Sequence, residues 1–232
     1  MIMHSKTTTC QECCESFLFQ PAMFNGRNVF IPRFCDPCME RLLDEEARNR
    51  KRTAVDGAVS FLKKTVPPIY WSTDKNRLPF NSVVTMDSWE YNPRGIGMVG
   101  ESGAGKSRLA VVLLKRMAQE EGRYCIFAPA TEFANACADQ FSDDKYVALR
   151  ASVKLSEVRN TPILLLDDLG KNRMTDRSES SLYELLEYRT SRMLPTHWTS
   201  NSNAKQLRTM FSSDRADAIM RRLIEFSDIY TF

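Results

Sequence analysis

Short, continuously apolar runs alternate with longer amphipathic stretches over most of this chain. Apolar residues in the longer stretches recur every three or four positions, which is typical of helices packed on one side, and Gly122 stands where the first would end. Asp176 and Glu179 resemble a capping box at the start of another. The pattern predicts an α/β fold with strands at residues 95–99, 124–128, 163–166, 196–199 and 229–232, and helices at 107–121, within 131–160, from 176 onward, at 204–211 and at 214–225.

A glycine-rich motif lies between the first of these strands and the helix that follows it. Residues 100–107 read GESGAGKS and fit the pattern GxxxxGKS. A triphosphate needs backbone N–H groups pointed at it, and the start of a helix adds partial positive charge. An ordinary glycine-rich turn is the alternative, although a chance match in a chain this long is on the order of one in a hundred. The predicted nucleotide-binding residues are Gly100, Gly103 and Gly105, which leave room for phosphate, Lys106 for the β- and γ-phosphates, and Ser107 for magnesium.

Acidic residues follow the most apolar run. Residues 163–166 are Ile-Leu-Leu-Leu and lead into Asp167 and Asp168, which predicts a central parallel strand with carboxylates at its carboxyl edge. The phosphate-binding motif is expected at the same edge. We therefore expect Asp167 to hold magnesium and Asp168 to orient and deprotonate a water molecule. At the end of the next strand, Asn201 could position that water, whereas His197 is expected to serve in packing.

Composition and charge narrow the class of protein. The 232 residues suit one domain of ordinary size and a small additional module. A net charge of +3 is too weak to argue for nucleic-acid binding alone. No apolar run approaches the roughly 18 residues of a membrane span, and the first six residues lack the apolar core of a signal peptide. A cytoplasmic protein without a membrane partner is expected.

The first forty residues carry most of the cysteines. Two CxxC pairs separated by about twenty residues have the spacing of a four-thiolate zinc site, whose metal would supply folding energy to so small a segment. Buried reduced thiols are the alternative, and His4 or Cys14 could replace one ligand. Asn25-Gly26 between the pairs predicts a hairpin turn. The predicted zinc ligands are Cys10, Cys13, Cys35 and Cys38, and four thiolates would leave no position open for chemistry.

A charged segment follows the cysteines. Residues 44–64 have a helical pattern, and the basic run at 48–52 could contact nucleic-acid phosphates or could be a solvated helix face. Pro67 and Pro68 are expected to end this helix. The aromatic residues 70 and 71 could line an adenine pocket or pack in the core. We expect a zinc module at residues 1–45, a helical linker at 46–64 and the nucleotide-binding domain at 65–232.

Together these motifs resemble the AAA+ ATPases of the DnaC/IstB-like group, which comprises helicase loaders and transposition helper ATPases. GESGAGKS resembles their Walker A motif, LLLDDLG at 164–170 their Walker B motif, and 199–201 their sensor 1 segment with Asn201 as sensor. Residues 217–223 resemble the segment with the arginine finger at Arg222. The resemblance covers about residues 65–232 and implies a five-stranded parallel sheet between helices. No C-terminal helical lid is evident.

The resemblance also implies a function. It implies an ATPase that loads a replicative helicase onto single-stranded DNA, with the N-terminal module as the partner-binding part. A transposition helper and a nucleotide-gated adaptor or inhibitor are the alternatives. Arg222, with Arg221 as runner-up, is expected to complete the site of a neighbouring subunit, which implies self-association. Alternatively, Arg222 is an ordinary surface arginine or contacts a nucleic-acid phosphate backbone.

Overall fold

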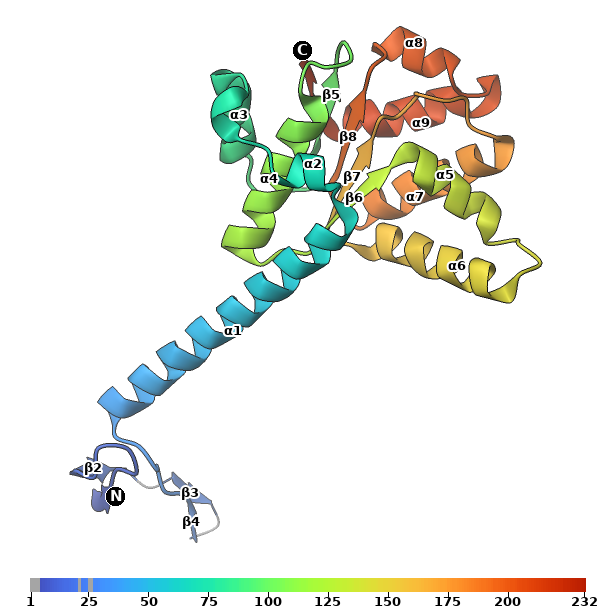
Figure 1. Ribbon diagram of the computed structural model, residues 1–232. Helices are drawn as coiled ribbons and strands as arrows, with labels where there is room; N and C mark the ends of the chain where they lie inside the picture. The colour runs from blue at the N-terminus through green and yellow to red at the C-terminus, as the bar shows by residue number, and fades with distance from the viewer. Residues whose placement is uncertain (1–4, 21, 25–26) are drawn as a thin grey trace. The chain divides into compact units, whose positions relative to one another are not determined.

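Five parallel strands form one sheet in the C-terminal part of the chain, in the order β6-β7-β8-β5-β9 (Figure 1). Every neighbouring pair is parallel, and β7 is buried along its whole length. The α/β fold and the five-stranded parallel sheet between helices are thus confirmed. The strands are β5 (Gly95–Val99), β6 (Cys125–Pro129), β7 (Ile163–Asp167), β8 (Thr196–Ser200) and β9 (Ser227–Thr231).

Helices cover both faces of this sheet in the computed structural model, which describes residues 5–20, 22–24 and 27–232 (Figure 1). Alternate residues of β7 divide between two apolar clusters, with Leu164 and Leu166 in one and Ile163 and Leu165 in the other. The first cluster includes α5 (Ala130–Asp139), α7 (Asp176–Ser191), α8 (Ala204–Thr209) and α9 (Ser213–Glu225), and the second includes the end of α1 (Asp36–Thr65), α3 (Phe80–Ser88) and α4 (Lys106–Glu121). Helix α6 (Lys145–Asn160) adds Val158 to the first cluster, and partly buried residues of α2 (Pro68–Trp71) pack against the second. The short element η1 (Lys75–Arg77) is a 3₁₀ turn.

The start of α7 differs from the predicted capping box. Thr175 is the cap, and its side chain accepts a hydrogen bond from the Ser178 N–H. Glu179 is buried and instead accepts hydrogen bonds from the backbone N–H of Ser212, at 3.0 Å, and from its hydroxyl. Because Ser212 is the cap of α9, the carboxylate lies where the partial positive charge of that helix is greatest. Glu179 therefore fastens α7 to the start of α9.

A fully buried guanidinium, Arg189, joins α7 to the end of α6 and to the start of β8. Its Nη1 donates to the carbonyl oxygens of Val158, Arg159 and Thr161, and its Nη2 donates to that of Pro195. Burial lowers the pKa of Arg189 to about 9. The Val158 and Arg159 carbonyls belong to the last turn of α6, where no intrahelical donor reaches them. One side chain on α7 thus caps a neighbouring helix.

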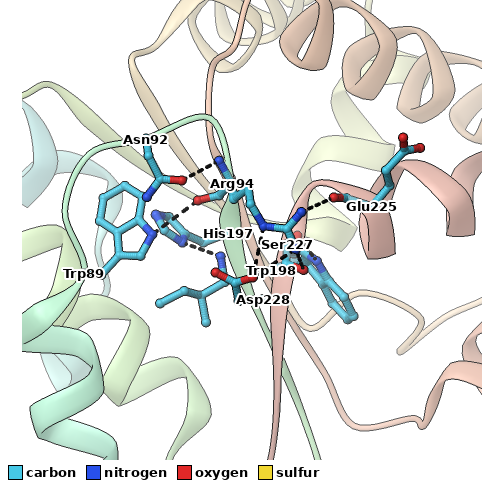
Figure 2. Close-up of polar contacts among 9 residues, drawn as sticks. Trp89, Asn92, Arg94, His197, Trp198, Glu225, Ser227 and Asp228 are labelled. Atoms are coloured by element: carbon cyan, nitrogen blue, oxygen red, sulfur yellow. Dashed lines mark hydrogen bonds and ion pairs between the residues drawn. The ribbon is translucent and has the colours of Figure 1, made fainter.

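A second arginine holds β9 to the edge of the sheet (Figure 2). Arg94 donates to the carbonyl oxygens of Glu225 and Ser227, and its Nε lies 3.0 Å from Asp228 Oδ1. Its own carbonyl accepts from the indole of Trp89 at 3.2 Å. These contacts join the segment before β5 to the end of α9 and to the beginning of β9.

His197 packs behind this arginine, within the sheet. Its Nδ1 accepts the Ile96 N–H at 2.9 Å, and its ring lies 4.7 Å from that of Trp89. Burial, with a smaller contribution from Arg189, lowers the pKa of His197 to about 3. A histidine that stays neutral and is hydrogen-bonded inside the sheet serves in packing, as expected.

The N-terminal part is described separately, because the chain divides into units at residues 1–53 and 54–232. In the first unit, β1 (Lys6–Thr9) pairs antiparallel with β2 (Ser16–Phe19), and β3 (Ala22–Phe24) pairs antiparallel with β4 (Arg27–Phe30). The hairpin turn predicted at Asn25-Gly26 lies outside the described residues. Helix α1 begins in this unit at Asp36 and ends at Thr65 in the second, just before the two prolines. In the described parts of the chain, no helix combines the length and apolar character that a membrane span needs.

Candidate nucleotide site and cysteine cluster

The phosphate-binding loop connects β5 to α4 at the carboxyl edge of the sheet. Gly103 and Gly105 have φ angles of +87° and +88°, in the left-handed region that favours glycine. Space is open around a Cβ placed on Gly103, so a ligand has access to the backbone there. Gly105 is the residue before the first turn of α4, whose N–H groups and partial positive charge suit an anion. Both glycines therefore have the backbone conformation that a phosphate-binding loop needs, and their contact with phosphate stays a prediction.

Gly100 is required for a different reason. Its φ is +148°, and a Cβ there would lie 2.2 Å from the carbonyl oxygen of Phe232. Phe232 in turn donates its N–H to the carbonyl of Val99 at 2.8 Å. The absence of a side chain at Gly100 therefore leaves room for Phe232. We expected it to leave room for phosphate, but the nearest atom to the position of its Cβ belongs to Phe232.

Lys106 begins α4 and is only 4% exposed. Its ammonium donates to the carbonyl oxygens of Gly100 and Glu101 and to Asn201 Oδ1, at 2.9, 2.8 and 2.8 Å. Burial lowers its pKa, and the charges of Asp168 and Asp167 act in the opposite direction. A positive charge is thus held between the loop and the acidic strand ends, as phosphate binding requires.

Asp167 ends β7 as a buried carboxylate. Its Oδ1 accepts from the Thr199 hydroxyl at 2.8 Å. Burial raises the pKa of Asp167, and hydrogen bonds with Ser107 and Thr199 limit that rise. A carboxylate beside a serine hydroxyl is a pair of oxygen ligands of the kind that magnesium prefers. The residues present therefore fit the predicted metal role of Ser107 and Asp167.

Asp168 adopts a left-handed backbone conformation, with φ of +58°. The Thr199 hydroxyl accepts its backbone N–H at 2.9 Å. Its carboxylate accepts from Asn201 Nδ2 at 3.3 Å and from Lys171 Nζ at 3.2 Å. The structure thus brings the predicted Asp168 and Asn201 together beside Lys106.

The segment before α3 flanks the phosphate-binding loop. Tyr70 packs against Phe127, with ring centroids 5.8 Å apart, which favours core packing over an adenine pocket for this residue. Leu78 lies 3.5 Å from the position of a Cβ on Gly105. Arg108 points to this segment and donates to the Ile69 carbonyl at 3.0 Å. Leu78 thus places an apolar side chain against the loop.

Arg222 lies on α9 and is paired within the chain. Its Nε donates to Glu187 of α7 at 2.8 Å, and a terminal nitrogen contacts the same carboxylate oxygen. The side chain is 14% exposed. Arg221, the runner-up, is exposed. The structure therefore joins Arg222 to a partner that the sequence did not indicate.

The four predicted metal-binding cysteines converge on one point in the N-terminal unit. The sulfur atoms of Cys10, Cys13, Cys35 and Cys38 all lie within 4.8 Å of one another, and that of Cys13 is 3.8 Å from that of Cys35. Zn–S bonds of about 2.3 Å in a tetrahedron place sulfur atoms about 3.8 Å apart. Cys14, an alternative ligand, is exposed and is not part of this cluster, and His4 lies outside the described residues.

Electrostatics also fit a cation in the cysteine cluster. Burial acts to raise the pKa of Cys10, but backbone hydrogen bonds, first that with Cys13, lower it to about 6. The hydrogen bond with Cys35 and burial raise the pKa of Cys38 to about 12. The Cys10 thiol thus ionises more readily than a free thiol, whereas the Cys38 thiol ionises less readily. A cation bound between the sulfur atoms would stabilise all four thiolates, and four converging thiols are a set of ligands that suits zinc.

Comparisons with known proteins agree with this geometry. The family model of the IstB-like ATP binding protein matches residues 36–231. The replicative helicase loader DnaI of Bacillus subtilis (strain 168) is 25% identical over 216 residues, which are 90% of this chain and 66% of that protein. The chain thus spans less than two thirds of the length of this relative.

Solved structures share the fold. The crystal structure of DnaI has a TM-score of 0.60 at 19% identity and covers 72% of this chain and 94% of that one. The crystal structure of the DnaC helicase loader has a TM-score of 0.57 at 21% identity, with 72% and 99% covered. At these identities the likeness shows the arrangement of the sheet and helices alone.

Proposed function

The chain belongs to the family of IstB-like ATP binding proteins, and we propose that it hydrolyses ATP to load a replicative helicase onto single-stranded DNA. Membership of this family confirms the resemblance inferred from the Walker motifs. The similarity to the helicase loader DnaI carries the proposal, because it covers 90% of the chain and so extends into the segment before residue 36, where the family match begins.

In the proposed reaction, the glycine loop and Lys106 bind the phosphates of ATP. Magnesium, held by Ser107 and Asp167, would supply positive charge at the phosphate oxygens. Asp168 accepts the proton of the attacking water, and Asn201 orients that water toward the γ-phosphate. The distances from Asn201 to both Lys106 and Asp168 support this assignment, because one amide can then serve the phosphate side and the water side.

We propose that Arg222 supplies the remaining positive charge in trans, in the site of a neighbouring subunit. An arginine at a developing phosphate charge can contribute about 10³–10⁵ in rate. The ion pair with Glu187 means that Arg222 has to exchange a carboxylate for the γ-phosphate of the other subunit. Arg221 remains the alternative, and its exposure is compatible with that role.

The cysteine cluster is proposed to bind zinc and to shape a module that binds the helicase. Four thiolates complete the coordination of zinc and leave no position for a reacting ligand, so the role is structural. The domain bounds proposed from the sequence assign this module to residues 1–45. The similarity to DnaI supports a helicase as partner, since that protein is a replicative helicase loader.

Transposition helper activity is a second candidate. The matching family is that of IstB-like ATP binding proteins, and the DnaC/IstB-like group includes transposition helper ATPases as well as helicase loaders. A nucleotide-gated adaptor that recruits or inhibits a helicase is a third possibility. The three roles differ in the partner recovered and in ATP turnover. The full-length chain, immobilised with ATP, should recover a hexameric helicase from a lysate of its source cells if the first role is correct, and a transposase if the second is.

Activity then separates the loader from the adaptor. Purified helicase should unwind a single-stranded circular template carrying an annealed strand only when this protein and ATP are added. Lys106→Ala should lose ATP binding, whereas Asp168→Ala should bind ATP and fail to release phosphate. Helicase capture without loading, and without any phosphate release stimulated by single-stranded DNA, would contradict the loader and support the adaptor.

A further inference from the structure

The ammonium of Lys106 already has a complete set of hydrogen-bond partners. A lysine offers three N–H donors, and here they are directed to Gly100 O, Glu101 O and Asn201 Oδ1, all within 2.9 Å. The group is buried, so little water is available to replace a partner that is lost. A phosphate oxygen that approaches Lys106 therefore competes with one of these three oxygens.

Asn201 is the partner that differs from the other two. The carbonyls of Gly100 and Glu101 belong to the phosphate-binding loop itself, whereas Asn201 is a side chain that follows β8. Its amide is held on both sides, because Oδ1 faces the ammonium and Nδ2 donates to the Asp168 carboxylate. Reversing the amide would point its N–H groups at the ammonium, so the orientation is fixed by charge.

We propose that Asn201 sets the nucleotide affinity of the site by competing with the β-phosphate for Lys106. This role is separate from the positioning of water, and it rests on the proposed nucleotide-binding function. Nucleotide binding then breaks the hydrogen bond between Lys106 and Asn201. In the bound form, Asn201 is free to turn toward the γ-phosphate. The residue that assists hydrolysis thereby weakens binding until Lys106 changes partner.

The helix that follows Asn201 packs against the loop after Asp168. Asn203, two residues after Asn201, caps α8 and forms a capping box with Gln206. Leu207 of α8 packs closely on Gly170, since a Cβ on this glycine would lie 2.5 Å from Leu207 Cδ1. Gly170 follows Asp168 by two residues. Few residues therefore separate Asn201 from the loop that carries Asp168.

ADP is the informative ligand because it has no γ-phosphate. A residue that acts only on the γ-phosphate or on water cannot affect ADP affinity, whereas one that competes for Lys106 must. We expect Asn201→Ala to bind a fluorescent ADP analogue about ten- to a hundredfold more tightly than the wild type, the range of one hydrogen bond to a charged group. Asn201→Asp should bind it at least about tenfold more weakly, because a carboxylate holds the ammonium more strongly than an amide.

Two controls separate the competition from a general loosening of the loop. Ser202→Ala alters the next side chain and should leave ADP affinity unchanged. Asn201→Leu keeps a similarly branched side chain, although a bulkier one, and lacks the oxygen, so it should tighten binding as Asn201→Ala does. Thermal unfolding of each variant shows that it is folded.

The outcomes distinguish this inference from the proposed function. A wild-type protein that binds no ADP would overturn both. A wild-type protein that binds ADP, with Asn201→Ala and Asn201→Leu unchanged or weaker, would overturn the competition and leave the nucleotide site standing. Equal tightening by Ser202→Ala would also refute it, since the effect would then lie in the loop and not in the Asn201 oxygen.

Discussion

The Thr199 hydroxyl makes two hydrogen bonds that orient both acidic residues after β7. It donates to the buried carboxylate of Asp167 and accepts the backbone N–H of Asp168. Thr199→Val keeps the shape of the side chain and removes only this hydroxyl. A hydrogen bond to a charged group contributes about 1.5–3 kcal/mol and a neutral one about 0.5–1.5 kcal/mol. The free energy of unfolding should therefore fall by roughly 2–4 kcal/mol.

The loss should depend on pH. Burial raises the pKa of Asp167 in the folded chain, so its contribution to the free energy of unfolding decreases as pH rises through the ordinary aspartate range. The Thr199 hydrogen bond opposes that rise in pKa, so Thr199→Val should raise it further. The difference in free energy of unfolding between Thr199→Val and the wild type should thus be largest at neutral pH. It should be smaller near pH ~4, because the hydroxyl stabilises a protonated Asp167 less than an ionised one.

Urea unfolding, followed by circular dichroism at neutral pH and near pH ~4, measures this difference in the free energy of unfolding. Thr199→Ser retains the hydroxyl and loses only a buried methyl group, so its free energy of unfolding should fall by about 0.5–1.5 kcal/mol, less than that of the valine variant. Equal unfolding midpoints for the valine and serine variants at neutral pH would refute the reasoning. So would a loss in the valine variant that grows as the pH is lowered.

Three further predictions concern other parts of the chain. Elemental analysis should find about one zinc per chain, lost in Cys10→Ser and kept in Cys14→Ser; a folded N-terminal unit without metal would contradict the assignment. Arg222→Ala and Asp168→Ala should each lack ATPase activity, and their mixture should recover part of it; no recovery in a mixture shown to co-assemble would count against a finger in trans. Arg94→Ala should lower the free energy of unfolding by about 1–2 kcal/mol, since part of the side chain is exposed, and an unchanged melting temperature would show that β9 is held by other contacts.

The sheet and the acidic side of the site could be predicted because their signals are local. Continuous apolar runs mark the buried strands, and the chain places Asp167 and Asp168 directly after one of them. The glycine motif is likewise contiguous, and its flanking strand and helix follow from periodicity. These features depend on neighbours in sequence, so the order of residues is sufficient to find them.

The residues that escaped prediction act across long sequence separations. Glu187 pairs with Arg222 across 35 residues, and Glu179 binds Ser212 across 33. From the sequence, Glu187 reads as an ordinary polar position of α7 and Glu179 as part of a capping box, because only the packing of α7 on α9 shows what they contact. Thr199 had a weak signal, as a hydroxyl in a buried strand, but its two partners follow from the register of β7 and β8.

Arg189 has a consequence for the motions of this domain. The α5–α6 hairpin is inserted between β6 and β7, and an insertion of this kind often opens as a unit of its own, exposing its amides to exchange. Here the last turn of α6 is fastened by a guanidinium on α7 that also binds the start of β8. Opening of that turn would break these hydrogen bonds. We therefore expect local opening to begin at the other end of the hairpin, around residues 140–144, where a mostly exposed loop joins the helices.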